Sequence, residues 1–174
     1  MLRHFSKEDL NKSLGYNLID SKSFHKTDFG PDFIKNNSAA GETVLTALIE
    51  ELETCSSFDF SVAFITQGGI ACLQNTLKKL KEQKTLRGRI LTSDYLHFTD
   101  PYALKKLLDN FPSIELKIYT KDSFHTKGYL FNQSNYHSLL IGSANLTESA
   151  LTENQEWNLR VISSEQGESL NTIR

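Results

Sequence analysis

The alternation of helical and extended patterns along residues 42–120 constrains the fold more than any other feature of the sequence. Apolar side chains recur at helical spacing in one segment and form β-prone runs in the next. The segments follow in the order helix, strand, helix, strand, helix, strand: residues 42–55, 58–66, 70–84, 87–93, 101–108 and 114–120. This order predicts an α/β fold with right-handed crossovers, in which the strand at residues 58–66 is buried on both faces.

A different rhythm begins after residue 121. Residues 125–131 and 136–142 predict two strands joined by a short polar turn, which makes a hairpin and therefore a mixed sheet. A polar loop and a final strand at residues 156–162 follow. We expect one domain over residues 41–174, because a chain of 174 residues suffices for one substantial core. Residues 1–40 lack sustained periodicity and predict an irregular N-terminal arm with room for one short strand.

Composition and net charge bear on which partners the protein is expected to bind. The chain is 39% hydrophobic and 23% charged, with a formal net charge of -2, so the protein as a whole has no polycationic character for binding nucleic acid. A local groove can still be basic. No window approaches 18 consecutive apolar residues and the N-terminus has no signal-like apolar region, so we expect a cytoplasmic protein with no membrane partner.

Two pairs of polar residues and one acidic residue carry the chemical signal. His125 and Lys127 are two residues apart in a predicted strand, so their side chains point the same way. Ser143 and Asn145 repeat that spacing in the sequence GSAN, and their short side chains offer hydrogen bonds to a tetrahedral oxyanion. Glu156, at the start of the last strand, is placed to accept a proton from one ring nitrogen of His125 and leave the other free to attack.

This ordered set resembles the HKD signature of the phospholipase D superfamily, which is HxK followed by GSxN and a downstream glutamate. Longer phrases, including FDFSVAFIT, FHTKGYLF and IGSANLTESALTENQEWNLRV, resemble the HKD nuclease-like domains at the N-terminus of bacterial DEAD/DEAH-type superfamily II helicases. The likeness runs from about residue 43 to residue 162. It implies a phospholipase D-like mixed sheet flanked by helices, with one HKD motif per chain.

The resemblance also implies a mechanism and partners. In that superfamily a histidine, here His125, attacks phosphorus without a metal or other cofactor and forms a covalent phosphohistidine, while a second histidine protonates the leaving oxygen. This chain has one full motif, so the second would come from another copy in a homodimer. The implied substrate is nucleic acid, with DNA expected. The alternative is a catalytically weak nucleic-acid-binding or dimerisation module of a helicase whose motor lies elsewhere in a longer polypeptide.

One position departs from the family pattern, and several residues have structural alternatives. The extended signature HxKxxxxD would place aspartate where the chain has Asn132, which we expect at the hairpin turn. Ser143 and Asn145 can also serve as turn or N-cap residues of a short helix near Thr147, and Glu156 can simply be solvated. Trp157 is expected to point to the opposite face of the last strand from Glu156 and to belong to the core, with a base-stacking platform as the alternative. The remaining histidines are interpreted as surface or structural residues: His4, His25, His97 and His137.

Overall fold

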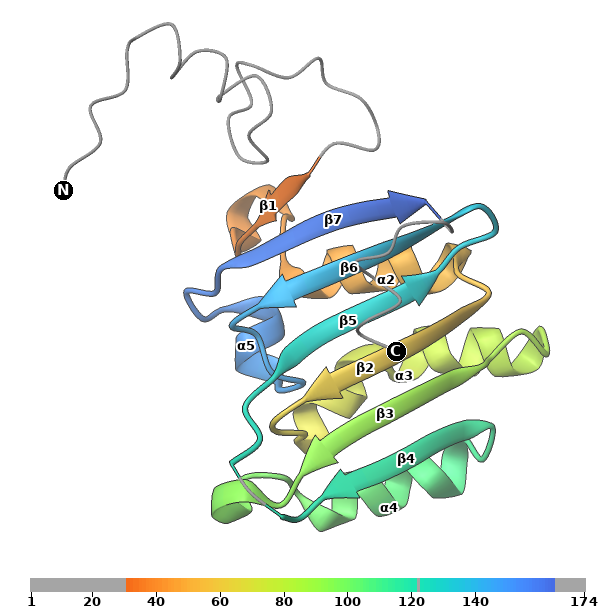
Figure 1. Ribbon diagram of the computed structural model, residues 1–174, viewed down its shortest axis with the longest axis vertical. Coiled ribbons are helices and arrows are strands. Elements are labelled where there is room, and N and C mark those ends of the chain that lie inside the picture. The colour runs from red at the N-terminus through yellow and green to blue at the C-terminus, as the bar shows by residue number, and fades with distance from the viewer. Residues whose placement is uncertain (1–30, 122, 165–174) are drawn as a thin grey trace, which may run out of the picture.

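Seven strands form one mixed sheet in the order β1-β7-β6-β5-β2-β3-β4, as the computed structural model shows for residues 31–121 and 123–164 (Figure 1). Strands β2, β3 and β4 are parallel, and every other neighbouring pair is antiparallel. The strands are β1 (Asp32–Ile34), β2 (Ser57–Val62), β3 (Gly88–Ser93), β4 (Ile114–Tyr119), β5 (Lys127–Asn132), β6 (Tyr136–Gly142) and β7 (Asn158–Ser164). The predicted mixed α/β sheet is confirmed.

Residues 32–34, within the predicted N-terminal arm, form β1 and pair with β7 at one edge of the sheet. Residues 1–30 of that arm lie outside the described residues, and the boundary at residue 40 stays a prediction. The helices are α2 (Val44–Thr54), α3 (Gln67–Glu82), α4 (Pro101–Asn110) and α5 (Glu148–Thr152), with short 3-10 helices η1 (Ser38–Ala40) and η2 (Tyr95–His97). Within the described ranges, no helix has the length and apolar character needed to cross a bilayer.

Local capping sets where the helices begin. The side chain of Asp100 accepts a hydrogen bond from the backbone of Tyr102 and, with a proline in the first turn, starts α4 as predicted. Helix α3 begins three residues earlier than the sequence suggested, because Thr66 accepts from the backbone of Gly69. A Cβ at Gly69 would lie 2.0 Å from the carbonyl oxygen of Leu146. Glycine therefore allows α3 to start against the loop that follows β6.

The core lies between the sheet and the helices, which stand behind the sheet in Figure 1. Alternate residues of β2 face this core, and Phe60 contacts the rings of Tyr129 and Phe131 at centroid distances of 5.0 and 5.6 Å. The other residues of β2 are half-buried on the opposite face, so the prediction that this strand is buried on both faces was wrong. Its polar residues Ser57, Asp59 and Ser61 alternate with the apolar ones and turn away from the helices.

Candidate active site

The residues of the two motifs meet at one end of the sheet, on the left in Figure 1. Strand β5 runs antiparallel to β2 and β6, so its first residue, Lys127, lies beside Val62 at the end of β2. His125 comes two residues before β5. Ser143 directly follows β6, and Glu156 lies two residues before β7. Antiparallel pairing thus gathers strand starts and strand ends from distant parts of the sequence.

His125 and Lys127 are in direct contact. The Lys127 Nζ atom lies 2.8 Å from Nδ1 of His125 and also donates to the His125 backbone oxygen at 3.0 Å. An ammonium group can only donate, so Nδ1 accepts and a neutral ring carries its proton on Nε2. The exposed ring is then a hydrogen-bond donor through Nε2.

Lys127 is a buried cation. The residue is 8% exposed, and burial lowers the pKa of its ammonium below the usual lysine value, while the negative charge of Glu156 opposes that shift. Phe64, just after β2, was placed among core residues by the alternation pattern. Its ring instead contacts His125 edge-on at 5.8 Å and lies 5.9 Å from Lys127 Nζ. No feature of the sequence distinguished Phe64 from the other phenylalanines of that segment.

Ser143 and Glu156 form a second pair at the site. The Ser143 hydroxyl donates a short hydrogen bond to Oε2 of Glu156, a carboxylate that is almost fully buried. The backbone of Trp157 donates to Ser143 Oγ at 3.0 Å, so the hydroxyl is held from two sides. The expected contact of Glu156 with His125 is not made among the described residues, because Lys127 occupies Nδ1 and Ser143 occupies the carboxylate.

Asn145 presents its amide group to the site. Its Oδ1 accepts from the backbone of Phe64 at 3.1 Å, which ties the loop after β6 to the end of β2. Within the described chain, Nδ2 of Asn145 has no hydrogen-bond acceptor and remains available to an anion. The helix N-cap in this loop is Thr147, so Ser143 and Asn145 do not serve as caps of α5.

Two further residues hold the GSAN loop, and the sequence analysis did not assign them that role. The hydroxyl of the fully buried Tyr129 donates to the Ala144 oxygen at 3.0 Å, and burial raises the pKa of its phenol well above the usual value. The side-chain oxygen of Asn158 accepts from the Ala144 backbone at 3.3 Å. Asn158 is buried in a strand, and a polar residue at an inward position of β7 was the available signal.

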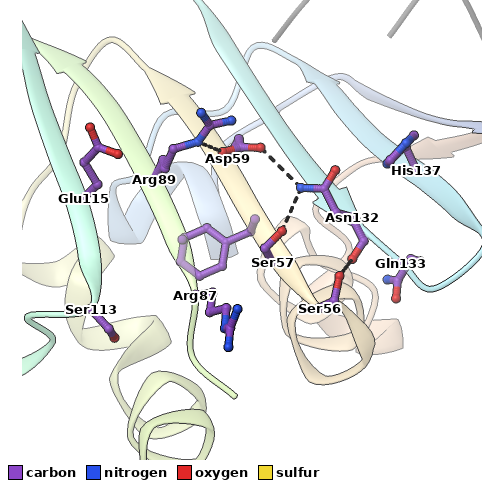
Figure 2. Close-up of a pocket in the computed structure, with 12 residues that line it drawn as sticks. Ser56, Ser57, Asp59, Arg87, Arg89, Ser113, Glu115, Asn132, Gln133 and His137 are labelled. Carbon is purple, nitrogen blue, oxygen red and sulfur yellow. Dashed lines mark hydrogen bonds and ion pairs between the residues drawn. The ribbon is translucent and has the colours of Figure 1, made fainter. Parts of the chain in front are cut away.

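Asn132 lies at the opposite end of β5 from Lys127, as its last residue, and the expectation that it occupies the hairpin turn was wrong. Its Nδ2 donates to Ser57 Oγ at 3.0 Å and to Asp59 Oδ2 at 3.3 Å, and Asp59 in turn pairs with Arg89 (Figure 2). This group lines a pocket of about 710 Å³ at the far end of the sheet. The departure from the family pattern therefore lies far from the candidate site.

Trp157 contradicts the prediction that it belongs to the core. The residue is 72% exposed, whereas its neighbours Glu156 and Asn158 are buried. Successive side chains point to opposite sides of an extended chain, so the two inward neighbours turn Trp157 outward. Of the other histidines, His97 is exposed and His137 is buried at the far end of the sheet, while His4 and His25 lie outside the described residues.

The arrangement has the parts needed to hold and attack a phosphodiester. It offers a buried cation in contact with an exposed imidazole, and the GSAN loop, which is bound to the backbone of Phe64 beside them, contributes a free amide donor and a hydroxyl. Fixed donors of this kind stabilise the negative charge that develops on phosphoryl oxygens. In the described part of the chain, no cluster of three side chains suited to a metal ion is found.

The family described as cardiolipin synthase, PLD-like domain matches residues 47–173, and the chain belongs to this family. The fold is similar to that of NucT from Helicobacter pylori, with a TM-score of 0.61 and 16% identity over 84% of this chain and 91% of that one. It is also similar to Nuc, a phospholipase D family member from Salmonella typhimurium, with a TM-score of 0.59 and 16% identity over 82% and 90% of the two chains. No curated protein matches in sequence. The resemblance to helicase-linked domains stays a prediction.

Proposed function

We propose that the chain is a metal-independent phosphodiesterase that cleaves nucleic acid, with DNA as the expected substrate. The observation that carries this proposal is the contact between the buried ammonium of Lys127 and the exposed ring of His125. Burying a cation is unfavourable, and here it stands beside an imidazole and a free amide, Asn145, in a member of the PLD-like family. An anion bound at this point would be stabilised by the cation and the amide donor.

The reaction we propose has two steps. In the first, Nε2 of His125 attacks phosphorus, the bond from phosphorus to the leaving oxygen breaks, and that oxygen takes a proton from His125 of a second copy. In the second step, a water molecule gives its proton to that second histidine and its oxygen attacks phosphorus. The phosphorus–nitrogen bond breaks, and its electron pair returns to the first His125.

The two histidines need different protonation states, because the nucleophile is a neutral ring with a lone pair on Nε2 and the acid is a protonated imidazolium. The contact seen here, in which Nδ1 accepts from Lys127, leaves the proton of a neutral ring on Nε2 of His125 and so blocks attack by that atom. A bound phosphate competes for the ammonium of Lys127. Once the ammonium turns to the phosphate, Nδ1 of His125 is free to carry the proton, and Nε2 becomes the nucleophile.

The shared site requires a homodimer, because the sequence holds one HxK motif that is followed by GSxN. A mixing experiment tests this. Adding an excess of the His125→Ala variant to the unaltered protein should lower its specific activity, since mixed dimers have one functional imidazole. Unchanged specific activity after subunit exchange, verified with differently tagged copies, would contradict a shared site.

A second candidate is a nucleic-acid-binding or dimerisation module attached to a helicase motor. The observation in its favour is that Glu156 is engaged by Ser143 and not by His125, so no carboxylate of the described residues is seen to orient the proposed nucleophile. This module would hold phosphate through Lys127 and Asn145 but cleave poorly.

A cleavage assay in excess EDTA separates the two candidates. We expect products from labelled single- or double-stranded DNA, and a loss of about 10²- to 10⁴-fold in rate for His125→Ala. The control, His137→Asn, alters another histidine of the hairpin at the far end of the sheet and should leave the rate unchanged. Binding without products would leave only the module, and full activity of His125→Ala would exclude the proposed nucleophile. Circular dichroism verifies folding of both variants.

A further inference from the structure

The exposed ring of Trp157 lies beside the GSAN loop and is fixed relative to it. The backbone of Ser143 donates to the Trp157 oxygen at 3.1 Å, and the backbone of Trp157 donates to Ser143 Oγ at 3.0 Å. These two hydrogen bonds set the Trp157 backbone at a constant distance from the proposed phosphate-binding residues. The ring is therefore an exposed aromatic surface adjacent to the site.

Its surroundings restrain the ring while leaving most of it open. Glu156 and Asn158 on either side are buried, and Phe33 of β1 contacts the indole edge-on at a centroid distance of 5.9 Å. An edge-to-face contact of this kind orients an aromatic ring without covering it. A restrained, exposed aromatic surface loses little conformational freedom when a planar group stacks on it.

We infer that Trp157 stacks on a nucleobase of single-stranded nucleic acid whose phosphate is held at Lys127 and Asn145. Nucleobases stack on exposed aromatic side chains whatever their sequence, and this mode is typical of proteins that bind single strands next to a cationic groove. In a duplex the faces of the bases are already covered by their neighbours. The inference rests on the proposed function and deepens it, because it assigns the strand preference and a residue that determines it.

A protein partner and a lipid bilayer fit the surface around Trp157 less well than a nucleobase does. The exposed apolar surface at this point comprises the contacting rings of Trp157 and Phe33, with Leu159 and the exposed Ile141 in register beside Phe33, whereas a stable protein interface takes about 20–30 residues and about 800 Å² on each partner. Next to Phe33, Arg160 is paired with Asp32 at 3.8 Å, so this cation is not free to attract a negatively charged bilayer. A nucleobase needs only one ring face, and the hydrogen bonds of Trp157 with Ser143 join it to the loop that carries Asn145.

Trp157 is the single tryptophan of the chain, so its fluorescence reports on this ring alone. The experiment titrates the His125→Ala variant, which prevents cleavage, with a single-stranded oligodeoxythymidylate and with an abasic strand of equal length. Fluorescence anisotropy of labelled strands measures binding independently. We expect the base-containing strand to quench Trp157 and the abasic strand to bind without quenching, and a blunt duplex should quench less than the single strand.

Substitution adds a second measurement. Trp157→Ala should weaken binding of the single strand by about 5- to 150-fold, the effect of losing one stacked base. Its binding of the abasic strand should not change. Trp157→Phe should retain part of the affinity. The control Leu108→Ala removes a partly exposed apolar side chain on α4 and should leave both affinities unchanged.

Each remaining outcome overturns the inference in a distinct way. Binding of the single strand without quenching would leave the proposed function intact and remove Trp157 from it, whereas no binding of any strand would defeat both. Equal quenching by duplex and single strand would contradict the strand preference. Shielding of Trp157 from acrylamide that is lost on dilution would place the ring in a contact between copies. A blue shift on anionic phospholipid vesicles would place it in a membrane.

Discussion

Replacing Asn132 by the aspartate of the family pattern should destabilise the protein and leave any phosphodiesterase activity no higher. Residue 132 ends β5, five residues after Lys127, so the two lie roughly 16 Å apart along an extended strand. At that distance an added carboxylate has little effect on the candidate site. Its neighbours are instead Ser57 and Asp59, which accept hydrogen bonds from the Asn132 amide (Figure 2).

The size of the effect follows from those contacts. A carboxylate at Asn132 Nδ2, 3.3 Å from Asp59 Oδ2, would raise the energy by about 5 kcal/mol at an effective dielectric constant of about 20. Protonating one carboxyl at pH 7 limits the loss to about 4 kcal/mol. Arg89, which pairs with Asp59, offsets part of the repulsion. The two lost hydrogen bonds contribute about 1 kcal/mol each. The repulsion and the lost hydrogen bonds together set an upper limit of about 6 kcal/mol, which Arg89 reduces, so we expect Asn132→Asp to lower the free energy of unfolding by about 2–6 kcal/mol.

Urea denaturation of Asn132→Asp and Asn132→Ala at pH 7 and pH 4 measures this. Asn132→Ala loses the hydrogen bonds without adding a charge, so the difference between the two variants isolates the repulsion. Repulsion raises the pKa of a carboxyl in the folded aspartate variant above its unfolded value, so the folded state binds more protons. The difference between the variants should thus shrink as the pH falls through that raised pKa. Equal stability of the two variants at pH 7, or higher activity of Asn132→Asp, would refute the reasoning.

Two further predictions concern the candidate site. Burial lowers the pKa of Lys127 below its usual value of 10.5, so the unfolded state binds more protons and the stability of the unaltered protein rises as the pH increases through the lowered pKa toward 10.5. Lys127→Met should abolish cleavage, and its free energy of unfolding at pH 7 should be at least that of the unaltered protein. The difference in stability should shrink as the pH rises through that range. The control is Lys117→Met, which removes an exposed lysine, and the same pH dependence in both variants would contradict the expectation. Gly142→Ala would place Cβ 2.1 Å from the Trp157 oxygen and should lower the free energy of unfolding, measured by thermal melts, by about 1–3 kcal/mol. The control is Gly128→Ala, which should be tolerated because the space around its Cβ is open. Equal melting temperatures of the two variants would argue against the close approach at Gly142.

The sequence was sufficient to predict the fold class and to predict that the motif residues lie close together. Period-two and helical patterns identify elements, and the predicted hairpin makes the strand carrying Lys127 antiparallel to the strand that precedes Ser143. The end of one such strand must lie beside the start of the other. A spacing of two between His125 and Lys127 then puts both on one side of the chain. Their meeting follows from backbone geometry, which the sequence pattern specifies well.

The errors concern side chains whose environment depends on distant segments. Trp157 was expected on the opposite face from Glu156, and the error lay in assigning that face to the core. The buried face is the one that carries Glu156 and Asn158, whose partners lie in the loop after β6. The contact of Glu156 with Ser143 in place of His125 depends on where β7 starts relative to β6. The position of Asn132 within β5 depends on pairing with Ser57 in β2. None of these relations is local in sequence.

The two ends of the sheet differ in how their polar groups are satisfied, and this difference favours one end as the functional one. At the far end, Asp59 is neutralised by Arg89 and receives the amide of Asn132, as expected where polar residues serve the fold. At the near end, the buried Lys127 contacts the His125 ring and makes no direct ion pair with a carboxylate among the described residues; burial lowers its pKa, and the negative charge of Glu156 opposes that shift. A purely structural lysine would gain stability from a direct ion pair or from exposure to water. A buried cation without a direct ion pair is the arrangement that an anion from outside the chain would stabilise, and this favours the near end as the functional one.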